Sequence, residues 1–269
     1  MQTPQVLGII AGNGVYPRLV ADAARKAGVK KIVAAAFTGE TDPALAKHVD
    51  PVEWMRVGQL SRLLKFFREQ DIHHAIMAGQ IAPGNLFDLR PDWKALLVLA
   101  KLKQRNAESI FAAIADELAK VDVDLLPATT FLEGSLAPTG LIAGSKLSRR
   151  EREDVALGWN TAKEIARLNT GQTVIVKNGT VVAVEALEGT NEAIRRGGAL
   201  ARKGAVMVKV AKPNQDMRFD VPVVGVETIR IAATSKLRVI AIESGKTLLL
   251  ERDAIIDLAG RAKISIVAR

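Results

Sequence analysis

The sequence predicts an α/β protein made of two α/β domains. The N-terminal domain is expected to be Rossmann-like with a parallel sheet, and the C-terminal domain to have a mixed sheet with a β-hairpin. Apolar runs of strand length alternate with helical patterns through the first half, whereas two β-rich runs meet at Asn-Gly in the second. A short Gly/Ser/Pro-rich stretch lies between the halves. We therefore expect domains at 1–132 and 148–269, joined by a linker at 133–147.

Continuous apolar runs followed by turn residues account for the strands of the N-terminal half. Buried strands are expected at 6–12, 30–37, 54–58 and 74–79. Apolar residues at helical spacing predict a helix ending near Lys26 and further helices at 59–70 and 107–121. The run 124–132 closes the series. Strands that alternate with helices favour a parallel sheet covered on both faces.

The C-terminal half begins with a long helix, 148–169, for which Ser148 is the expected N-cap. The runs around Asn178-Gly179, within 173–187, predict a tight hairpin. Further strands are expected at 205–211, 239–244, 247–251 and 264–268, and the intervening helices at 190–202, 227–236 and 253–262.

Composition narrows the classes of function. The 269 residues are 48% hydrophobic, enough to build sizeable cores, and the absence of cysteine excludes disulfides, thiolate metal sites and a cysteine nucleophile. The formal net charge of +9 favours anionic partners, such as phosphorylated small molecules, nucleic acid or an acidic lipid surface. The N-terminus lacks the basic region of a signal peptide, and no apolar run is long enough to span a membrane. We expect a cytoplasmic protein with at most a peripheral membrane contact.

Two glycine turns follow the first and fourth expected strands. Parallel strands end at one edge of a sheet, where ligands bind, so we expect both turns there as candidate substrate-binding residues: Gly12, Asn13, Gly14, Gly79 and Gln80. A dinucleotide site is disfavoured because Pro17 stands where the third glycine of that motif belongs. Glycines needed only for tight turns are the simpler alternative.

Two charged clusters offer further candidates. Glu185 and Glu188 end a strand, and a helix carrying Arg195 and Arg196 follows; Thr190 as a helix cap explains this pattern by itself, and an anion bound at the helix N-terminus is the alternative. In 212–225, Asp216 and Asp220 flank Arg218 before an apolar strand. An ion pair on a solvated loop competes there with a metal and phosphate site. The three histidines lack metal-ligand spacing, so any metal would be oxygen-bound, such as Mg²⁺.

The motifs occur in the order AGNGVYP, MAGQI, TGQTVIVKNGTVVAVEALEGT, KPNQDMRFDVPVVG. In this order, and over essentially the whole chain, the sequence resembles the UDP-2,3-diacylglucosamine pyrophosphatases of lipid A biosynthesis, the Mg-dependent family unrelated to the calcineurin-like metallophosphoesterases. The resemblance implies Mg²⁺-dependent hydrolysis of UDP-2,3-diacylglucosamine to UMP and 2,3-diacylglucosamine 1-phosphate. It also implies that the C-terminal domain is catalytic.

The resemblance makes Asp220, in the R-x-D-x-P motif, the expected catalytic residue and metal ligand. Asn191 stands where the family pattern leads us to expect Asp; it can cap or coordinate but cannot act as a base. The other expected metal ligands are Asp216 and Glu188. The substrate-binding candidates, from pattern and resemblance together, are the two glycine turns and Gln172, Gly189, Thr190, Asn191, Arg195 and Arg218.

The expected partner is a lipid-linked nucleotide sugar. Peripheral contact with the inner membrane or with neighbouring lipid A enzymes is consistent with the resemblance, and a homodimer is left open. A non-catalytic nucleotide- or RNA-binding regulator is the alternative function. Against it, the one tyrosine and three tryptophans form no stacking platform and the basic residues are dispersed, so we expect no nucleic-acid partner.

Overall fold

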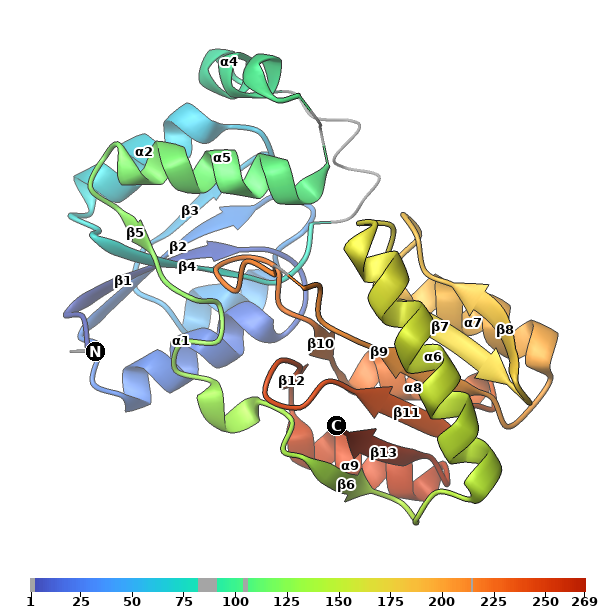
Figure 1. Ribbon diagram of the computed structural model, residues 1–269. Helices are drawn as coiled ribbons and strands as arrows, with labels where there is room; N and C mark the ends of the chain where they lie inside the picture. Colours follow the sequence, from blue (N-terminus) through green and yellow to red (C-terminus); the bar gives the residue numbers. More distant parts are fainter. Residues whose placement is uncertain (1–2, 82–90, 104–105, 214) are drawn as a thin grey trace. The chain divides into compact units, whose positions relative to one another are not determined.

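The computed structural model describes residues 3–81, 91–103, 106–213 and 215–269. The chain divides into two compact units (Figure 1). Unit 1 contains Met1–Glu133 together with Asp216–Asp220, and unit 2 contains Gly134–Gln215 and Val221–Arg269. The α/β fold class with two domains is confirmed.

Unit 1 has a five-stranded, fully parallel sheet with the strand order β3-β2-β1-β4-β5. The chain moves outward from β1 in both directions, so a topological switch point lies between β1 and β4, where doubly wound sheets bind ligands. The strands are β1 Val6–Ala11, β2 Lys31–Phe37, β3 Val52–Met55, β4 His74–Ala78 and β5 Asp124–Leu125.

Helices cover both faces of this sheet, as the alternating pattern predicts. In Figure 1, α1 lies on one face, and α2 and α5 lie on the other. The core between α2, α5 and the sheet is apolar, with Phe67 and Leu118 fully buried. The helical elements are α1 Tyr16–Lys26, the 3-10 turn η1 Pro43–Lys47, α2 Leu60–Glu69, α4 Trp93–Lys101 and α5 Ala107–Ala119.

Unit 2 is built on a six-stranded mixed sheet with the order β6-β13-β11-β9-β7-β8. Strands β9, β11 and β13 are parallel neighbours, and β6, β7 and β8 pair antiparallel with theirs. The strands are β6 Gly140–Ala143, β7 Thr173–Lys177, β8 Thr180–Val184, β9 Val206–Lys209, β11 Val239–Ile242 and β13 Ser265–Ala268. The short parallel pair β10 Val223–Val224 and β12 Leu248–Leu249 stands apart from this sheet.

Alternating side chains give the sheet of unit 2 two apolar faces. Val174 and Val208 pack in one apolar cluster with residues of α6, whereas Ile175 and Met207 pack in another with residues of α7, α8 and α9. The expected N-cap Ser148 is confirmed, because it forms a capping box at the start of α6. The helices are α6 Arg149–Arg167, α7 Thr190–Ala201, α8 Val226–Thr234 and α9 Arg252–Arg261.

The hairpin expected at Asn178-Gly179 is also confirmed. Strands β7 and β8 pair antiparallel across this turn, with Lys177 opposite Thr180. Asn178 and Gly179 both have positive φ angles, 52° and 76°, which is the geometry that an Asn-Gly turn favours.

Three expectations about boundaries are corrected. Residues 140–143 of the expected linker form β6, because Leu141 and Ala143 pair with β13. The strand expected over 124–132 is limited to β5, and beyond it the backbone N–H of Ala128 donates to the carbonyl of Met217 (2.7 Å). Asp216–Asp220, assigned to the second domain by the sequence, belongs to unit 1.

Packing and hydrogen bonding explain how a segment of the second half becomes part of unit 1. The ring of Phe219 lies 5.9 Å from that of Phe111 on α5 and contacts the apolar core of unit 1. We call residues 212–222 the crossing segment, because the chain leaves unit 2 and returns to it within this stretch. Among the described residues, no helix is both long and apolar enough to cross a membrane.

Candidate active site

The two glycine turns of unit 1 meet, as the sequence predicts. Asn13 and Gln80 form an isolated antiparallel bridge beyond the ends of β1 and β4. A Cβ atom on Gly12 would lie 2.5 Å from the carbonyl oxygen of Gln80, and one on Gly79 would lie 2.6 Å from that of Asn13. The close approach of the two backbones therefore requires both glycines, and their role in substrate binding stays a prediction.

In the crossing segment, Asp216 and Arg218 form the ion pair expected from the sequence. The Arg218 Nε and Nη2 atoms donate to Asp216 at 3.0–3.2 Å and 2.7 Å, and the Arg218 backbone N–H donates at 3.0 Å. The hydrogen bond from the Arg218 side chain outweighs burial and holds the pKa of Asp216 below its ordinary value. Both oxygens of Asp216 already accept from Arg218, so Asp216 shapes this turn, and its role as a metal ligand stays a prediction.

Asp220 ends the turn that this ion pair closes. Its backbone N–H donates to the carbonyl of Asp216 (2.9 Å), and its side chain is half-buried. The turn and the Phe219 contact fix the backbone of Asp220 on unit 1. Asp220 and Asp216 thus share a unit, whereas the third expected metal ligand, Glu188, belongs to unit 2. Over the described ranges, no group of three or more His, Asp or Glu side chains is placed to hold a metal ion.

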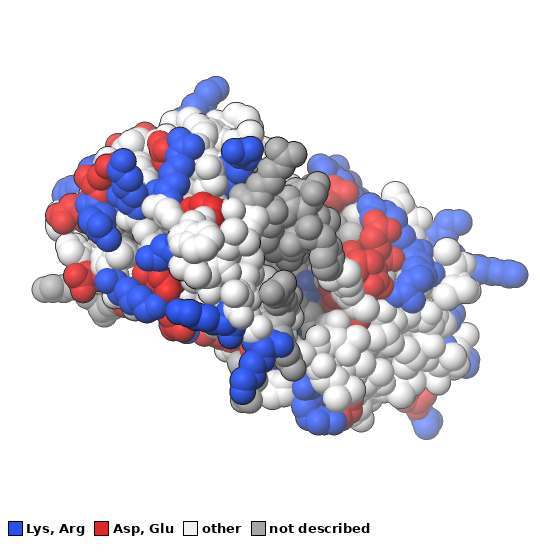
Figure 2. Space-filling model, turned by 90° about the horizontal axis from the view of Figure 1, so that it is seen from above, with Lys and Arg blue, Asp and Glu red and all other residues white. Residues whose placement is uncertain are grey.

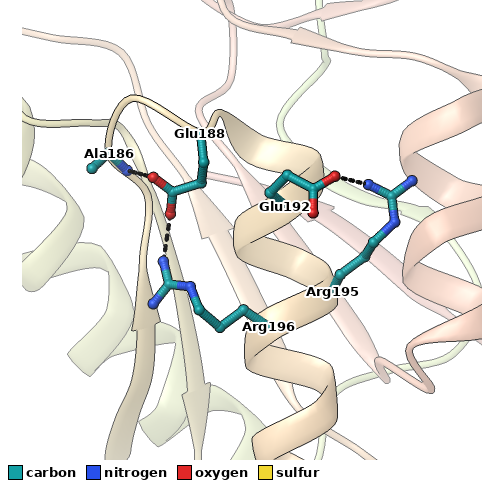
Figure 3. A pocket seen from close by; sticks show the side chains of 5 residues that line it. All are labelled: Ala186, Glu188, Glu192, Arg195 and Arg196. Atoms are coloured by element: carbon teal, nitrogen blue, oxygen red, sulfur yellow. Dashed lines mark hydrogen bonds and ion pairs between the residues drawn. The ribbon is translucent and has the colours of Figure 1, made fainter.

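Around the start of α7, the arginines are paired within unit 2 (Figure 3). Glu188 accepts from Arg196 and from the backbone N–H of Ala186 (3.1 Å), while Arg195 pairs with Glu192. Burial would raise the pKa of Glu188, but hydrogen bonds from its own backbone N–H, from Arg196 and from the Ala186 N–H lower it below its ordinary value. The five residues drawn line an open depression in which each arginine is already neutralised by a glutamate.

The first residue of α7, Thr190, takes part in a buried polar network that the sequence did not reveal. Glu185 accepts from the Thr190 hydroxyl (2.8 Å) and from the Gln172 backbone N–H (3.2 Å), and Lys209 Nζ donates to Thr190 Oγ1 (3.0 Å). Glu185 and Lys209 are only 7% and 6% exposed. The prediction that Thr190 caps α7 is wrong. Gly189 is the N-cap and Thr190 is the first helical residue, and the Thr190 hydroxyl donates to Glu185 instead of to the helix backbone.

A second buried charge lies at the same edge of the sheet. Glu243 follows β11 and is 8% exposed; it accepts from Lys163 Nζ (2.6 Å), Lys246 Nζ (3.0 Å) and the Ala211 backbone N–H (2.7 Å). Burial would raise the pKa of Glu243, but the hydrogen bonds from Lys163 and Ala211 lower it below its ordinary value. We call these residues, together, the carboxyl-edge cluster: Lys163, Glu185, Thr190, Lys209 and Glu243.

The carboxyl-edge cluster holds both ends of the crossing segment. At the outgoing end, Glu243 binds the N–H of Ala211, and at the returning end, Lys209 Nζ donates to the carbonyl of Val223 (3.1 Å). A buried charge is costly unless it is paired and hydrogen-bonded, so these contacts are specific. One pattern in the sequence indicates these buried charges: an apolar strand followed directly by a charged residue. Lys209 ends the run VMVK (206–209), and Glu243 ends the run VIAIE (239–243).

Of the other expected site residues, unit 1 also contains Gly14, and unit 2 also contains Asn191. Gln172 is the most informative of those in unit 2. Its side-chain Oε1 is buried and, in the described part of the chain, has no hydrogen-bond partner. A buried acceptor without a donor is destabilising by about 1–3 kcal/mol, so this oxygen is suited to a donor or a cation supplied by a ligand.

The fold and these sites define a two-unit α/β protein in which charged groups gather at the carboxyl ends of parallel strands. Residues 6–135 match the family described as the LpxI N-terminal domain, and residues 138–267 match the LpxI C-terminal domain. The chain belongs to the LpxI family, which confirms the family resemblance seen in the sequence.

One relative and one solved structure illustrate the range of similarity. The chain is 29% identical over 264 residues to UDP-2,3-diacylglucosamine pyrophosphatase LpxI of Caulobacter vibrioides, covering 94% of this chain and 93% of that protein. The biotin carboxylase domain of the Hydrogenobacter thermophilus 2-oxoglutarate carboxylase aligns with 75% of this chain and 41% of its own, at 12% identity and a TM-score of 0.30. This structural likeness is too low to carry an argument.

The Glu243 contacts generate a prediction about stability. Glu243→Ala should lower the free energy of unfolding by about 1–3 kcal/mol, because the Ala211 N–H and Lys163 lose a buried acceptor. The control is Glu227→Ala, which removes an exposed ion pair to Arg230 and should change stability by about 0–1 kcal/mol. Chemical denaturation measures both. Equal effects would contradict a special role for Glu243.

The pH dependence of the same contact has a defined sign. The pKa of Glu243 is below its ordinary 4.5 in the folded protein, so its contribution is fully present above pH 4.5. It is lost as the pH falls through the folded-state pKa. The stability difference between wild type and Glu243→Gln should therefore be largest near neutral pH and shrink below pH 4.5.

Proposed function

We propose that this protein is a UDP-2,3-diacylglucosamine diphosphatase of lipid A biosynthesis. Water would cleave the phosphate–phosphate bridge, with UMP and 2,3-diacylglucosamine 1-phosphate as the two products. The observation that carries the proposal is the match to the LpxI family along both units, 6–135 and 138–267. The Caulobacter relative, named as a UDP-2,3-diacylglucosamine pyrophosphatase, is similar over 94% of this chain. The similarity therefore extends over both units and is not limited to one domain.

We assign the central chemical role to Asp220. Asp220 is the Asp of the R-x-D-x-P motif to which the family resemblance assigns the reaction, and the chain belongs to that family. Mg²⁺ needs only one or two protein carboxylates when substrate phosphates and water complete its shell, so the donor set fits. When bound, Mg²⁺ would supply charge neutralisation at the diphosphate oxygens. Asp220 itself would hold the cation at a fixed place, since its backbone is tied into the turn.

Unit 2 supplies groups suited to an anionic, hydroxyl-bearing substrate. The proposed binding residues are Gln172, whose Oε1 has no donor among the described residues, and Thr190 with Asn191 in the first turn of α7. The Thr190 hydroxyl is already used by Glu185 and Lys209, so Thr190 would bind through its backbone N–H. Arg195 is exposed and can exchange Glu192 for a phosphate, because an exposed ion pair is weak. We place the activity in the cytoplasm, at the membrane surface where a diacylated nucleotide sugar resides.

The proposed reaction predicts metal-dependent release of UMP. Pure protein incubated with UDP-2,3-diacylglucosamine should release UMP and 2,3-diacylglucosamine 1-phosphate in equal amounts. EDTA should abolish the release and added Mg²⁺ should restore it, because the diphosphate charge is then neutralised again. Chromatography of the nucleotide product is the measurement. Absence of UMP would refute the proposed function. UMP release that is unaffected by EDTA would refute only the requirement for a metal ion.

A substitution separates catalysis from structure. Asp220→Ala should lower kcat about 10²–10³-fold with little change in melting temperature, since it removes a group that acts on the transition state. The matched control, Asp216→Ala, breaks a partly exposed ion pair in the same turn and should have a milder effect on kcat. Kinetics and thermal melting of both variants make the comparison. Near-normal turnover by Asp220→Ala would remove this residue from the mechanism.

A further inference from the structure

Helix α4 displays an apolar stripe to solvent. Trp93, Leu96 and Leu97 are 74%, 47% and 46% exposed, and Ala100 is also exposed. Their spacing, i, i+3, i+4 and i+7, puts them on one side of the helix. On the opposite side, Val98 packs against the core of unit 1, as does the buried Ala95. The helix is thus apolar on both sides, and only one side is covered by the described protein.

Several contacts fix this helix to unit 1. Asp92 caps it through Ala95 N–H (2.9 Å) and also accepts from the Ser61 N–H of α2 (2.6 Å). Lys94 pairs with Glu117 of α5 at 3.1 Å. Because both neighbouring helices hold α4, it cannot roll to bury Trp93, Leu96 and Leu97 without losing these bonds.

The chemistry around the stripe identifies what can cover it. Two exposed lysines, Lys101 and Lys103, follow the stripe at the C-terminal end of the helix, and the chain has a net charge of +9. Figure 2 looks down on the molecule from above, and on this face uncharged surface lies among both basic and acidic side chains. Tryptophan and leucine beside lysine are the composition of helices that lie in the headgroup region of a bilayer.

A second copy of the chain fits the stripe less well. A stable protein interface needs about 800 Å² from each partner, with polar groups at its rim. Three large side chains on a nine-residue helix provide a much smaller surface. A bilayer needs no matching protein surface, and anionic lipid complements the lysines.

We propose that α4 docks the protein on the surface of an anionic lipid bilayer. Trp93, Leu96 and Leu97 would enter the boundary between headgroups and acyl chains, while Lys101 and Lys103 would contact lipid phosphates. This inference rests on the proposed function, because a diacylated substrate is presented by a membrane. It adds a binding surface that lies outside the carboxyl-edge cluster and the Asp220 turn.

The experiment uses the full chain and vesicles of phosphatidylglycerol and phosphatidylcholine. Wild type should float with the vesicles, more strongly as the phosphatidylglycerol fraction rises and less strongly as salt is added. Leu96→Gln with Leu97→Gln should weaken binding about tenfold or more, because binding scales with buried apolar area. The control is Leu168→Gln with Leu200→Gln. These leucines are 64% and 65% exposed, at the C-terminal end of α6 and on α7, and their substitution should leave binding unchanged.

Three outcomes would overturn the proposal. Wild type that does not bind the vesicles, or equal losses in both double variants, would remove α4 from membrane contact. Sedimentation showing a wild-type dimer that Leu96→Gln with Leu97→Gln converts to monomer, without effect on vesicle binding, would assign the stripe to a second copy.

Activity on two forms of substrate separates this inference from the proposed function. The α4 variant should hydrolyse a short-chain, water-soluble analogue at the wild-type rate but lose activity on vesicle-embedded substrate. If the variant with Leu96→Gln and Leu97→Gln matched wild type on both the soluble and the vesicle-embedded substrate, docking through α4 would be contradicted. If neither form releases UMP, even with wild type, the proposed function fails, while vesicle flotation still decides whether α4 binds lipid.

Discussion

The structure depends on one constraint: two buried charges in unit 2 fix both ends of a segment whose middle belongs to unit 1. Glu243 holds the N–H of Ala211 and Lys209 holds the carbonyl of Val223, at the carboxyl edge of one sheet. Neither charge can leave its partners cheaply, since an unpaired buried charge is destabilised by several kcal/mol. The chain between them therefore cannot drift along the sheet edge. These contacts restrict the conformations of the chain between them, so less conformational entropy is lost when Asp216–Asp220 becomes ordered.

The same constraint connects the fold to the proposed chemistry. Within the crossing segment, the Asp216–Arg218 pair closes a turn, Phe219 packs on Phe111, and Asp220 follows on a backbone that is already fixed. A catalytic carboxylate lowers the activation barrier most when its position is fixed before the substrate binds, because no reorganisation energy is then added during the reaction. The two carboxylates that precede β10 therefore have different roles. Asp216 shapes the turn through its ion pair with Arg218, and the turn fixes the backbone that carries Asp220.

Local patterns predicted much of this molecule, and long-range contacts account for what they missed. The hairpin at Asn178-Gly179 and the cap at Ser148 depend on neighbouring residues, so the sequence indicates them directly. By contrast, Phe219 meets Phe111 from more than a hundred residues away, and no local signal moves Asp216–Asp220 into unit 1. Helix α4 was missed because it is apolar on both sides and so lacks a clear periodicity. Family resemblance supplied the reaction and Asp220, which composition and spacing alone could not.

The central claim is that Asp216–Asp220 is an ordered part of unit 1, and amide hydrogen exchange tests it most directly. The informative amides are that of Ala128, which donates to Met217, and that of Asp220, which donates to Asp216. We expect both to exchange about 100-fold or more slowly than the same residues in an unstructured peptide. Exchange of both amides at peptide rates, while the amides of β1 remain protected, would show that the segment is a free loop and would contradict the account.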